Sequence, residues 1–248
     1  MNKKKQSIFL SASWENLIMI NYEVNSEILK KYLPIHTELD LYKGKAIVSI
    51  VGFMFKNTKV FGLKWPFHTN FEEVNLRFYI KHFDGEKWNR GVAFISEIVP
   101  KPAISIIANA LYNEHYSTAK MKNLLIENDE NLEIEYHWKR GSNFWNYMKV
   151  VANKKLSKIP ENSEEEFIFE HYKGYNQLDD KTTIEYCLEH PSWMTYKVEK
   201  FELNCNVQNL YGKEFVPFIN PSHLSSVFLA KGSDVIVRKP TYISIKEL

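Results

Sequence analysis

The stretch Phe71–Phe83 alternates polar and apolar residues in a pattern that could build a binding site. Successive side chains of a strand point to opposite faces, so every second residue shares a face. One face would then be apolar, and the other would carry Glu73, Asn75, Arg77 and Tyr79. The guanidinium of Arg77 offers five donors in a planar fork that matches a carboxylate. These residues are therefore our candidate anchor for a small organic acid or a carbonyl compound.

Further groups that exchange protons lie close by in the sequence. Glu97 belongs to the next strand-like stretch, Trp88–Val99, and His115 and Tyr116 follow soon after it. Histidine titrates near neutral pH and can act as an acid or a base. Glu73, Glu97 or His115 would serve as proton donor or acceptor if the site is catalytic, and the sequence assigns no catalytic residue.

The polar face could line an internal cavity, or it could face water in a structural ion pair. Inside a cavity, Arg77 would need an acidic partner, because a buried arginine without one is strongly unfavourable. Glu73 and Glu97 are the candidates for this partner, and the register of the hairpin decides between them. A cavity around Arg77 predicts a ligand site, whereas an Arg77 in bulk water predicts a scaffold with a filled interior.

The elements that must position these residues are mostly strands. The dipeptide Asp84-Gly85 separates Phe71–Phe83 from Trp88–Val99 and is typical of a hairpin turn. A helix is expected from about Pro102 to Tyr112. It has a proline placed for the first turn and apolar residues three and four apart, at Ile104, Ile107, Ala108 and Leu111.

Other segments continue this pattern. A short helix over 26–33 would stop at Pro34, and Ser163 has the spacing of a capping residue before a second one. We expect a strand over 169–175, and we expect Gly232 to divide strands at 225–230 and 235–238. The sequence therefore predicts a mainly β protein with a few short helices.

Composition limits the classes of function. The chain has 248 residues without a linker-like tract and is predicted to form one domain, 1–248. Its 32 basic and 30 acidic residues nearly balance, which argues against a nucleic-acid partner. The longest apolar run, 46–55, is about half a membrane span, so no membrane partner is expected. Composition does not exclude a small-molecule ligand or the formation of a homo-oligomer.

No metal or cofactor site is expected. The eight histidines form neither H-x-H nor H-E-x-x-H, and Cys187 and Cys205 lack ligand spacing. No P-loop and no dinucleotide-binding G-x-G-x-x-G is present. The apolar stretch after the first lysines is too short for a signal peptide, so a cytoplasmic location is expected.

Several stretches together resemble the YqjF-like family of uncharacterised bacterial proteins, nearly end to end. They lie at 14–24 (WENLIMINYEV), 33–34, 37–40, 48–53, 71–79, 91–95, 111–114, 170–175 (EHYKGY), 189–193 (EHPSW) and 228–233 (FLAKGS). Two positions depart from the family pattern, which has Arg where this chain has Asn109 and Trp where it has Lys173.

That family is in turn distantly similar to acetoacetate decarboxylase. The resemblance implies a large antiparallel barrel that encloses a cavity. Decarboxylation in acetoacetate decarboxylase depends on a pair of lysines, one of which forms a Schiff base. The resemblance therefore implies a search for the same pair in this chain. The corresponding stretch here, 113–117, contains no lysine, and Lys120 and Lys122 are not adjacent. We therefore expect no Schiff-base decarboxylation.

Overall fold

The computed structural model describes residues 5–141 and 143–244. Its strands are β1 Ile8–Val24, β2 Glu38–Leu39, β3 Ala46–Val60, β4 Phe71–Phe83, β5 Trp88–Val99, β6 Tyr116–Thr118, β7 Lys120–Glu127, β8 Asn131–Lys139, β9 Asn146–Lys158, β10 Lys173–Gln177, β11 Thr182–Glu189, β12 Met194–Asn204, β13 Leu224–Arg238 and β14 Thr241–Ser244. The α-helices are α1 Pro102–Tyr112, α2 Glu164–Phe169 and α3 Val207–Tyr211, and the 3-10 helices are η1 Ser26–Tyr32, η2 Lys213–Phe215 and η3 Pro221–His223.

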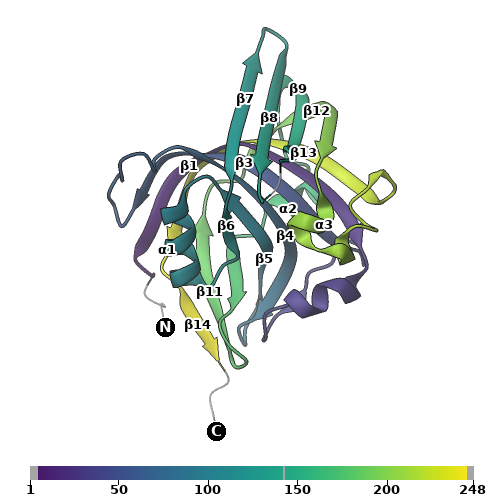
Figure 1. Ribbon diagram of the computed structural model, residues 1–248. Helices are drawn as coiled ribbons and strands as arrows, with labels where there is room; N and C mark the ends of the chain where they lie inside the picture. Colours follow the sequence, from purple (N-terminus) through teal and green to yellow (C-terminus); the bar gives the residue numbers. More distant parts are fainter. Residues whose placement is uncertain (1–4, 142, 245–248) are drawn as a thin grey trace.

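The strands form one large sheet that closes into a ring (Figure 1). The neighbours run β11-β10-β5-β4-β3-β1-β13, and β11 pairs with β13 through Leu188 and Val237. Most pairs are antiparallel, but β5 pairs in parallel with β10 and with β6. The expected mainly β architecture is thus confirmed, with a mixed sheet in place of a wholly antiparallel one.

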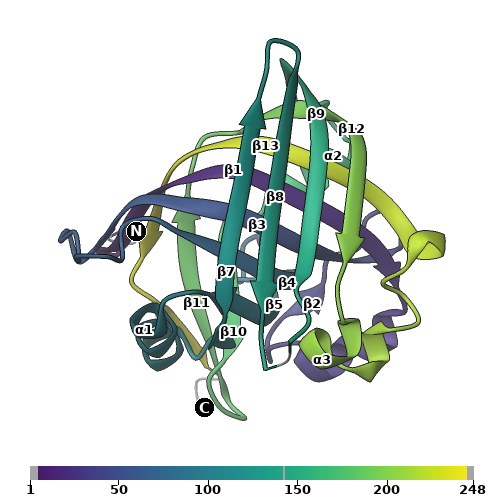
Figure 2. The ribbon, with the colours of Figure 1, turned by 45° about the horizontal axis from the view of Figure 1, so that its top comes forward.

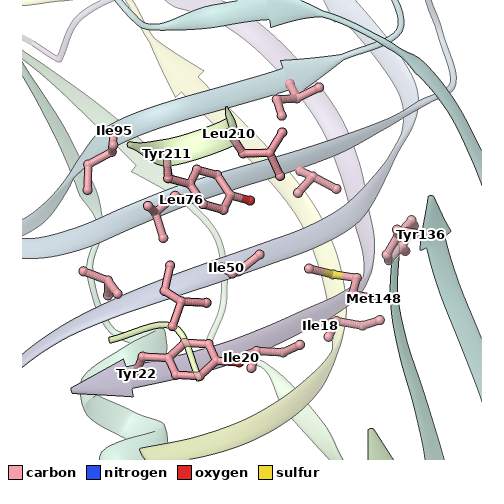
Figure 3. Close-up of a cluster of buried hydrophobic side chains, with 14 of the residues drawn as sticks. Ile18, Ile20, Tyr22, Ile50, Leu76, Ile95, Tyr136, Met148, Leu210 and Tyr211 are labelled. Atoms are coloured by element: carbon pink, nitrogen blue, oxygen red, sulfur yellow. The ribbon is translucent and has the colours of Figure 1, made fainter. Parts of the chain in front are cut away.

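A second layer of strands packs against the outside of the ring. The strands β12, β9, β8 and β7 continue the sheet beyond β13 and cross in front of β1 and β3 (Figure 2). Tyr136 and Met148 of this layer meet Ile18 and Ile50 of the ring, with Tyr211 of α3 in the same apolar cluster (Figure 3). The apolar face of β4 also lies in this cluster. Burial of this kind stabilises a fold in proportion to the apolar area removed from water.

The opposite face of β4 points into the ring. There a second apolar cluster joins side chains of the ring strands to those of α1 and α2. One strand therefore has its apolar side chains in the outer core and its polar side chains towards the interior, which follows from the period of two.

The sequence predicted several element boundaries correctly and missed others. β4, β5 and α1 have the expected bounds, and Ser163 caps α2 by accepting from Glu166 N at 3.0 Å. The strand expected over 169–175 begins only at Lys173, because α2 continues to Phe169. The first short helix is a 3-10 helix capped by Asn25.

Gly232 does not divide two strands, and that prediction is wrong. β13 runs unbroken through it, and Gly232 pairs with Glu15 of β1. Its φ is +85°, and a Cβ built on it would lie 1.9 Å from the backbone oxygen of Trp14. A left-handed residue inside a strand lets β1 and β13 approach where a side chain could not fit.

We expect Gly232→Ala to destabilise the protein by about 3 kcal/mol, because the methyl group must displace backbone and the positive φ is strained for alanine. Urea unfolding would measure the loss. Gly44→Ala is the matched control: its φ is +84° and a Cβ added there would have no neighbour within 4 Å, so only the strain contribution applies. Equal losses in the two variants would contradict the role of the close approach.

Among residues 5–141 and 143–244, no helix is long and apolar enough to cross a membrane.

Candidate functional site

A cavity of about 100 Å³ lies inside the ring, lined by residues from all seven ring strands and from α1. Most of its wall is apolar and aromatic, with Phe9, Trp14, Phe53, Phe55, Phe71 and Phe94 among the lining side chains. Its polar groups come from β4, β5, β6, β10 and β11 and from the segments around α1 and α2. Largely apolar walls with a few convergent polar groups are typical of small-molecule sites.

Glu73 is at the centre of the polar wall. It is 3% exposed, and both of its oxygens accept hydrogen bonds, from Asn75 Nδ2 at 2.9 Å and from the Tyr116 hydroxyl at 2.8 Å. Burial raises the pKa of Glu73 to about 7, against the lowering effect of these bonds and of Arg77. Glu73 can therefore take up or release a proton near neutral pH.

Two further carboxyl groups line the same cavity. Glu97 is 1% exposed and lies opposite Asn75 in the β4–β5 ladder. Burial raises its pKa well above the usual value, and the neighbouring charges of Glu114 and Glu73 raise it further. Glu114 follows α1 and accepts from the Tyr186 hydroxyl at 2.5 Å, and burial raises its pKa to about 8. Glu114 is therefore mainly protonated at neutral pH, and the pKa of Glu97 is shifted in the same direction.

Arg77 lines the cavity, but it does not form the expected pair. In the described part of the chain, neither Glu73 nor Glu97 lies within ion-pair distance of its guanidinium. Its Nη2 donates to Ile168 O at 3.2 Å, and its Cζ lies 5.6 Å from the centre of the Tyr79 ring. The β4–β5 register places Glu97 opposite Asn75, and a bulge between Leu76 and Arg77 places Phe94 opposite Arg77.

His171 enters the cavity from the segment after α2. Its Nε2 lies 3.2 Å from Asp40 Oδ2, and Asp40 also accepts from Arg90 Nε at 2.6 Å. Burial lowers the pKa of His171 to about 4, so its ring is neutral at physiological pH. Asp40 therefore fixes the orientation of a neutral imidazole whose ring lines the cavity.

Several buried polar atoms at this cavity have no hydrogen-bond partner. Among residues 5–141 and 143–244, eight buried side-chain N or O atoms are unpartnered. Five of them belong to residues that line the cavity: Trp14 Nε1, Asn75 Oδ1, Arg77 Nε, Glu97 Oε2 and His171 Nδ1. Leaving such a group unpaired costs about 1–3 kcal/mol, so each of these atoms is a candidate contact for a polar group.

The predicted site residues separate into two groups. Glu73, Asn75, Arg77, Glu97 and Tyr116 line the cavity. Tyr79 is buried in the inner apolar cluster but is not a lining residue, and its hydroxyl hydrogen-bonds with Ser49 Oγ at 2.6 Å, whereas His115 is exposed.

Three residues of the cavity wall, Glu114, Tyr186 and His171, were not predicted from the sequence. Glu114 and His171 stand in motifs of the family resemblance, at 111–114 and 170–175, and that was the available signal. Tyr186 lies outside every motif of the family resemblance.

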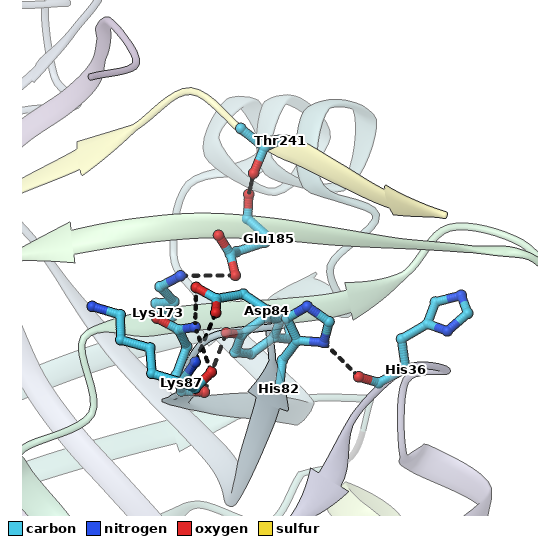
Figure 4. Close-up of polar contacts among 9 residues, drawn as sticks. His36, His82, Asp84, Lys87, Lys173, Glu185 and Thr241 are labelled. Carbon is cyan, nitrogen blue, oxygen red and sulfur yellow. Dashed lines mark hydrogen bonds and ion pairs between the residues drawn. The ribbon is translucent and has the colours of Figure 1, made fainter. Parts of the chain in front are cut away.

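The two positions that depart from the family pattern have structural partners. Asn109 bridges α1 to β6, because its amide donates to Tyr116 O at 3.0 Å and accepts from Tyr116 N at 2.9 Å. Lys173 lines the cavity, and its Nζ lies 2.9 Å from Glu185 Oε2 (Figure 4). Lys120 and Lys122 are exposed.

Over the described ranges, no three His, Cys, Asp or Glu side chains gather in a way that could hold a metal ion.

Comparison with known proteins places the chain in a family. A family model described as an uncharacterised conserved protein, DUF2071, matches residues 11–234. The uncharacterised protein YqjF of Bacillus subtilis is 29% identical over 111 residues, and the match spans 44% of either protein. The chain thus matches less than half the length of that relative.

Solved structures show the same fold at low identity. Acetoacetate decarboxylase from Legionella pneumophila superposes with a TM-score of 0.63 at 14% identity, over 98% of this chain and 90% of that one. An acetoacetate decarboxylase-like enzyme from Sphingomonas wittichii gives 0.64 at 11% identity, over 96% and 94%. The enduracididine biosynthesis enzyme MppR, complexed with the condensation product of pyruvate and imidazole 4-carboxaldehyde, gives 0.65 at 8% identity, over 96% and 90%. The chain belongs to the DUF2071 family, and its fold is that of the acetoacetate decarboxylase-like proteins.

Proposed function

We propose that this protein binds a small carbonyl compound in the cavity and transfers a proton at the carbon next to the carbonyl group. The single observation that carries the proposal is one cavity whose lining includes three carboxyl groups with raised pKa values and five residues with an unpartnered polar atom. A protonated carboxyl can donate to a carbonyl oxygen, and an ionised one can accept a proton from carbon. Pairs of titratable groups with separated pKa values are typical of such acid–base chemistry.

Each carboxyl has a role in this proposal. Glu97 keeps its proton because it is buried, and its unpartnered Oε2 is free to contact the carbonyl oxygen of the ligand. Glu73, with a pKa of about 7, is partly ionised at neutral pH and removes the proton from carbon. The negative charge that develops on the carbonyl oxygen is stabilised by the Glu97 hydrogen bond. Transfer of the Glu97 proton to this oxygen gives an enol and leaves Glu73 protonated and Glu97 ionised, and reversal returns a proton to carbon.

Lysines do not supply the chemistry in this proposal. Among the described lining residues Lys173 is the one lysine, and it is held in an ion pair by Glu185. The carbonyl compound therefore stays unmodified and is activated by hydrogen bonding. The choice of a carbonyl ligand draws support from the fold relatives, which include a decarboxylase of acetoacetate and an enzyme complexed with pyruvate.

The alternative is a non-catalytic scaffold or interaction protein with a filled interior. A cavity of about 100 Å³ with unpartnered polar atoms favours the ligand-binding alternative. We also propose a cytoplasmic location, which the free thiols of Cys187 and Cys205 support.

The test uses acetophenone as a probe, together with a variant in which a larger side chain on α1 fills the cavity. The wild type is expected to bind acetophenone and to exchange its methyl protons for deuterium in D₂O, measured by loss of the methyl signal in proton NMR. Ala108→Phe places a ring in the cavity, because Ala108 lines it and is 9% exposed. This variant should lose both binding and exchange.

Ala110→Phe is the matched control, because Ala110 lies on the exposed face of the same helix. It should bind and exchange as the wild type does. Circular dichroism of both variants checks that the fold is kept. A wild type that neither binds acetophenone nor exchanges its protons would contradict the proposed function, as would an Ala108→Phe variant that retains exchange.

A further inference from the structure

The buried edge of the cavity near Tyr79 carries an unpartnered donor and an unpartnered acceptor. The ring of His171 lies 4.8 Å from the Tyr79 ring, and Arg77 Cζ lies 5.6 Å from the same ring. Arg77 also donates to Ile168 O, three residues before His171. Arg77 Nε and His171 Nδ1 are both buried and have no partner among the described residues.

The two atoms have fixed and opposite hydrogen-bonding roles. Asp40 is ionised: burial alone would raise its pKa, but hydrogen bonds from His171 and Arg90 lower it below the usual value. An ionised carboxylate accepts, so the imidazole proton resides on Nε2 and Nδ1 is left as a bare acceptor. Arg77 Nε carries a proton and can only donate. A partner for both atoms must therefore donate to one and accept from the other.

A hydroxyl group meets this requirement. Its proton can go to His171 Nδ1, and its oxygen can accept from Arg77 Nε. A carbonyl oxygen cannot donate to Nδ1, and neither can a carboxylate. A carboxylate would also add a negative charge beside Glu73, Glu97 and Glu114. Among the described lining residues, the cationic side chains that could balance this charge are Arg77 and Lys173, and Lys173 is already paired with Glu185.

A hydroxyl group between Arg77 and His171 would lie close to the position proposed for the carbonyl oxygen at Glu97. Glu97 pairs with Asn75, and Arg77 is two residues further along β4 on the same face. Two residues of a strand span about 7 Å, and both side chains reach into the cavity, so one small molecule can contact both groups. The apolar walls around them suit a ligand without a net charge.

We propose that the natural ligand is a neutral hydroxycarbonyl compound, whose carbonyl oxygen accepts from Glu97 and whose hydroxyl bridges Arg77 Nε and His171 Nδ1. This inference rests on the proposed function and narrows its ligand class. His171 contacts the ligand in this arrangement, and Asp40 is a positioning residue that holds the tautomer.

The test compares four probes of matched shape by isothermal titration calorimetry. They are 2-hydroxyacetophenone, acetophenone, 2-phenylethanol and phenylglyoxylate. These carry both groups, the carbonyl alone, the hydroxyl alone, and a carbonyl beside a carboxylate. We expect 2-hydroxyacetophenone to bind about tenfold more tightly than acetophenone, because two otherwise unpartnered groups become satisfied. Phenylglyoxylate should bind more weakly than both 2-hydroxyacetophenone and acetophenone.

Two variants separate the hydroxyl contact from general effects on the cavity. His171→Phe should abolish the tenfold preference of 2-hydroxyacetophenone over acetophenone. Asp40→Asn should also abolish it, because an amide can donate to Nε2 and move the imidazole proton to Nδ1. His190→Phe is the control: His190 stacks on Trp193 with ring centres 4.1 Å apart and is not a lining residue of the cavity.

The outcomes distinguish this inference from the function on which it rests. If acetophenone binds and the hydroxyl adds nothing, the hydroxycarbonyl class is overturned, the proposed function stands, and the bridging position belongs to water. Tightest binding of phenylglyoxylate would overturn it in favour of an organic acid. If none of the ketones binds, both proposals fail. A preference that survives His171→Phe would also overturn the inference.

Discussion

Raising the pH from about 6.5 to about 8.5 is expected to lower the free energy of unfolding by about 2–5 kcal/mol. The cause is the set of three buried carboxyl groups at the cavity. Burial raises the pKa of Glu73 to about 7 and that of Glu114 to about 8, and it raises that of Glu97 well above the usual value. In the unfolded chain these groups ionise near 4.5.

The sign follows from the protons bound in each state. Above about 4.5 the unfolded chain releases protons that the folded protein still holds, so stability falls as pH rises. The contribution is complete below 4.5 and is lost as pH rises through the folded pKa values. Every pKa unit of difference corresponds to about 1.4 kcal/mol.

Histidine acts in the opposite direction at lower pH. Burial lowers the pKa of His171 to about 4, so its contribution is present above the usual value of 6.5 and is lost as pH falls towards 4. His190 shifts in the same direction. Below about 6.5 the histidines therefore oppose the carboxyls, whereas above it the carboxyls dominate. Cys187 and Cys205 also have raised pKa values, so the measurement should end below about 9.

Urea unfolding at several pH values would measure this effect. Glu97→Gln should reduce the loss between about pH 6.5 and 8.5 by at least about 1 kcal/mol, because the neutral amide no longer ionises. Glu72→Gln is the matched control, since Glu72 is partly exposed and accepts from Asn123 at 2.6 Å. A stability that does not change over this range would contradict the raised pKa values.

Local signals in the sequence were enough to predict the elements that carry the site. The turn at Asp84-Gly85 and the alternation in Phe71–Phe83 depend on neighbouring residues, and so do the apolar spacing and proline of α1. The structure keeps these elements at the expected bounds. Patterns of this kind also indicated that one face of β4 is polar, which is the face that lines the cavity.

The composition of the site depends on contacts that no local pattern records. The β4–β5 register places Glu97 opposite Asn75, and a bulge beside Arg77 shifts the register by one residue and places Phe94 opposite Arg77. Arg77 is held instead by Ile168 O, 91 residues away in the sequence. His171 reaches the cavity because Asp40, 131 residues away, positions its ring. Such long-range pairings require the closed ring, and the family resemblance was the only sequence signal for that closure.

Replacing Glu73 by Gln is expected to slow deuterium exchange into acetophenone by about 10²–10⁴-fold. The amide keeps the shape and can still contact Asn75 and Tyr116, which hydrogen-bond to Glu73 at 2.9 and 2.8 Å. It cannot accept a proton from carbon. The dissociation constant of acetophenone should therefore stay within about threefold of the wild-type value, since Glu97 still donates to the carbonyl oxygen.

The wild-type exchange rate should also depend on pH in a way that identifies the base. It should rise as Glu73 ionises around pH 7 and fall once the acidic partner Glu97 loses its proton at higher pH. Glu72→Gln, one residue away on the opposite face of β4, should keep both the rate and the profile. If Glu73→Gln exchanges as fast as Glu72→Gln, Glu73 is not the base. Loss of binding in Glu73→Gln, with exchange per bound ligand unchanged, would instead assign Glu73 to ligand recognition.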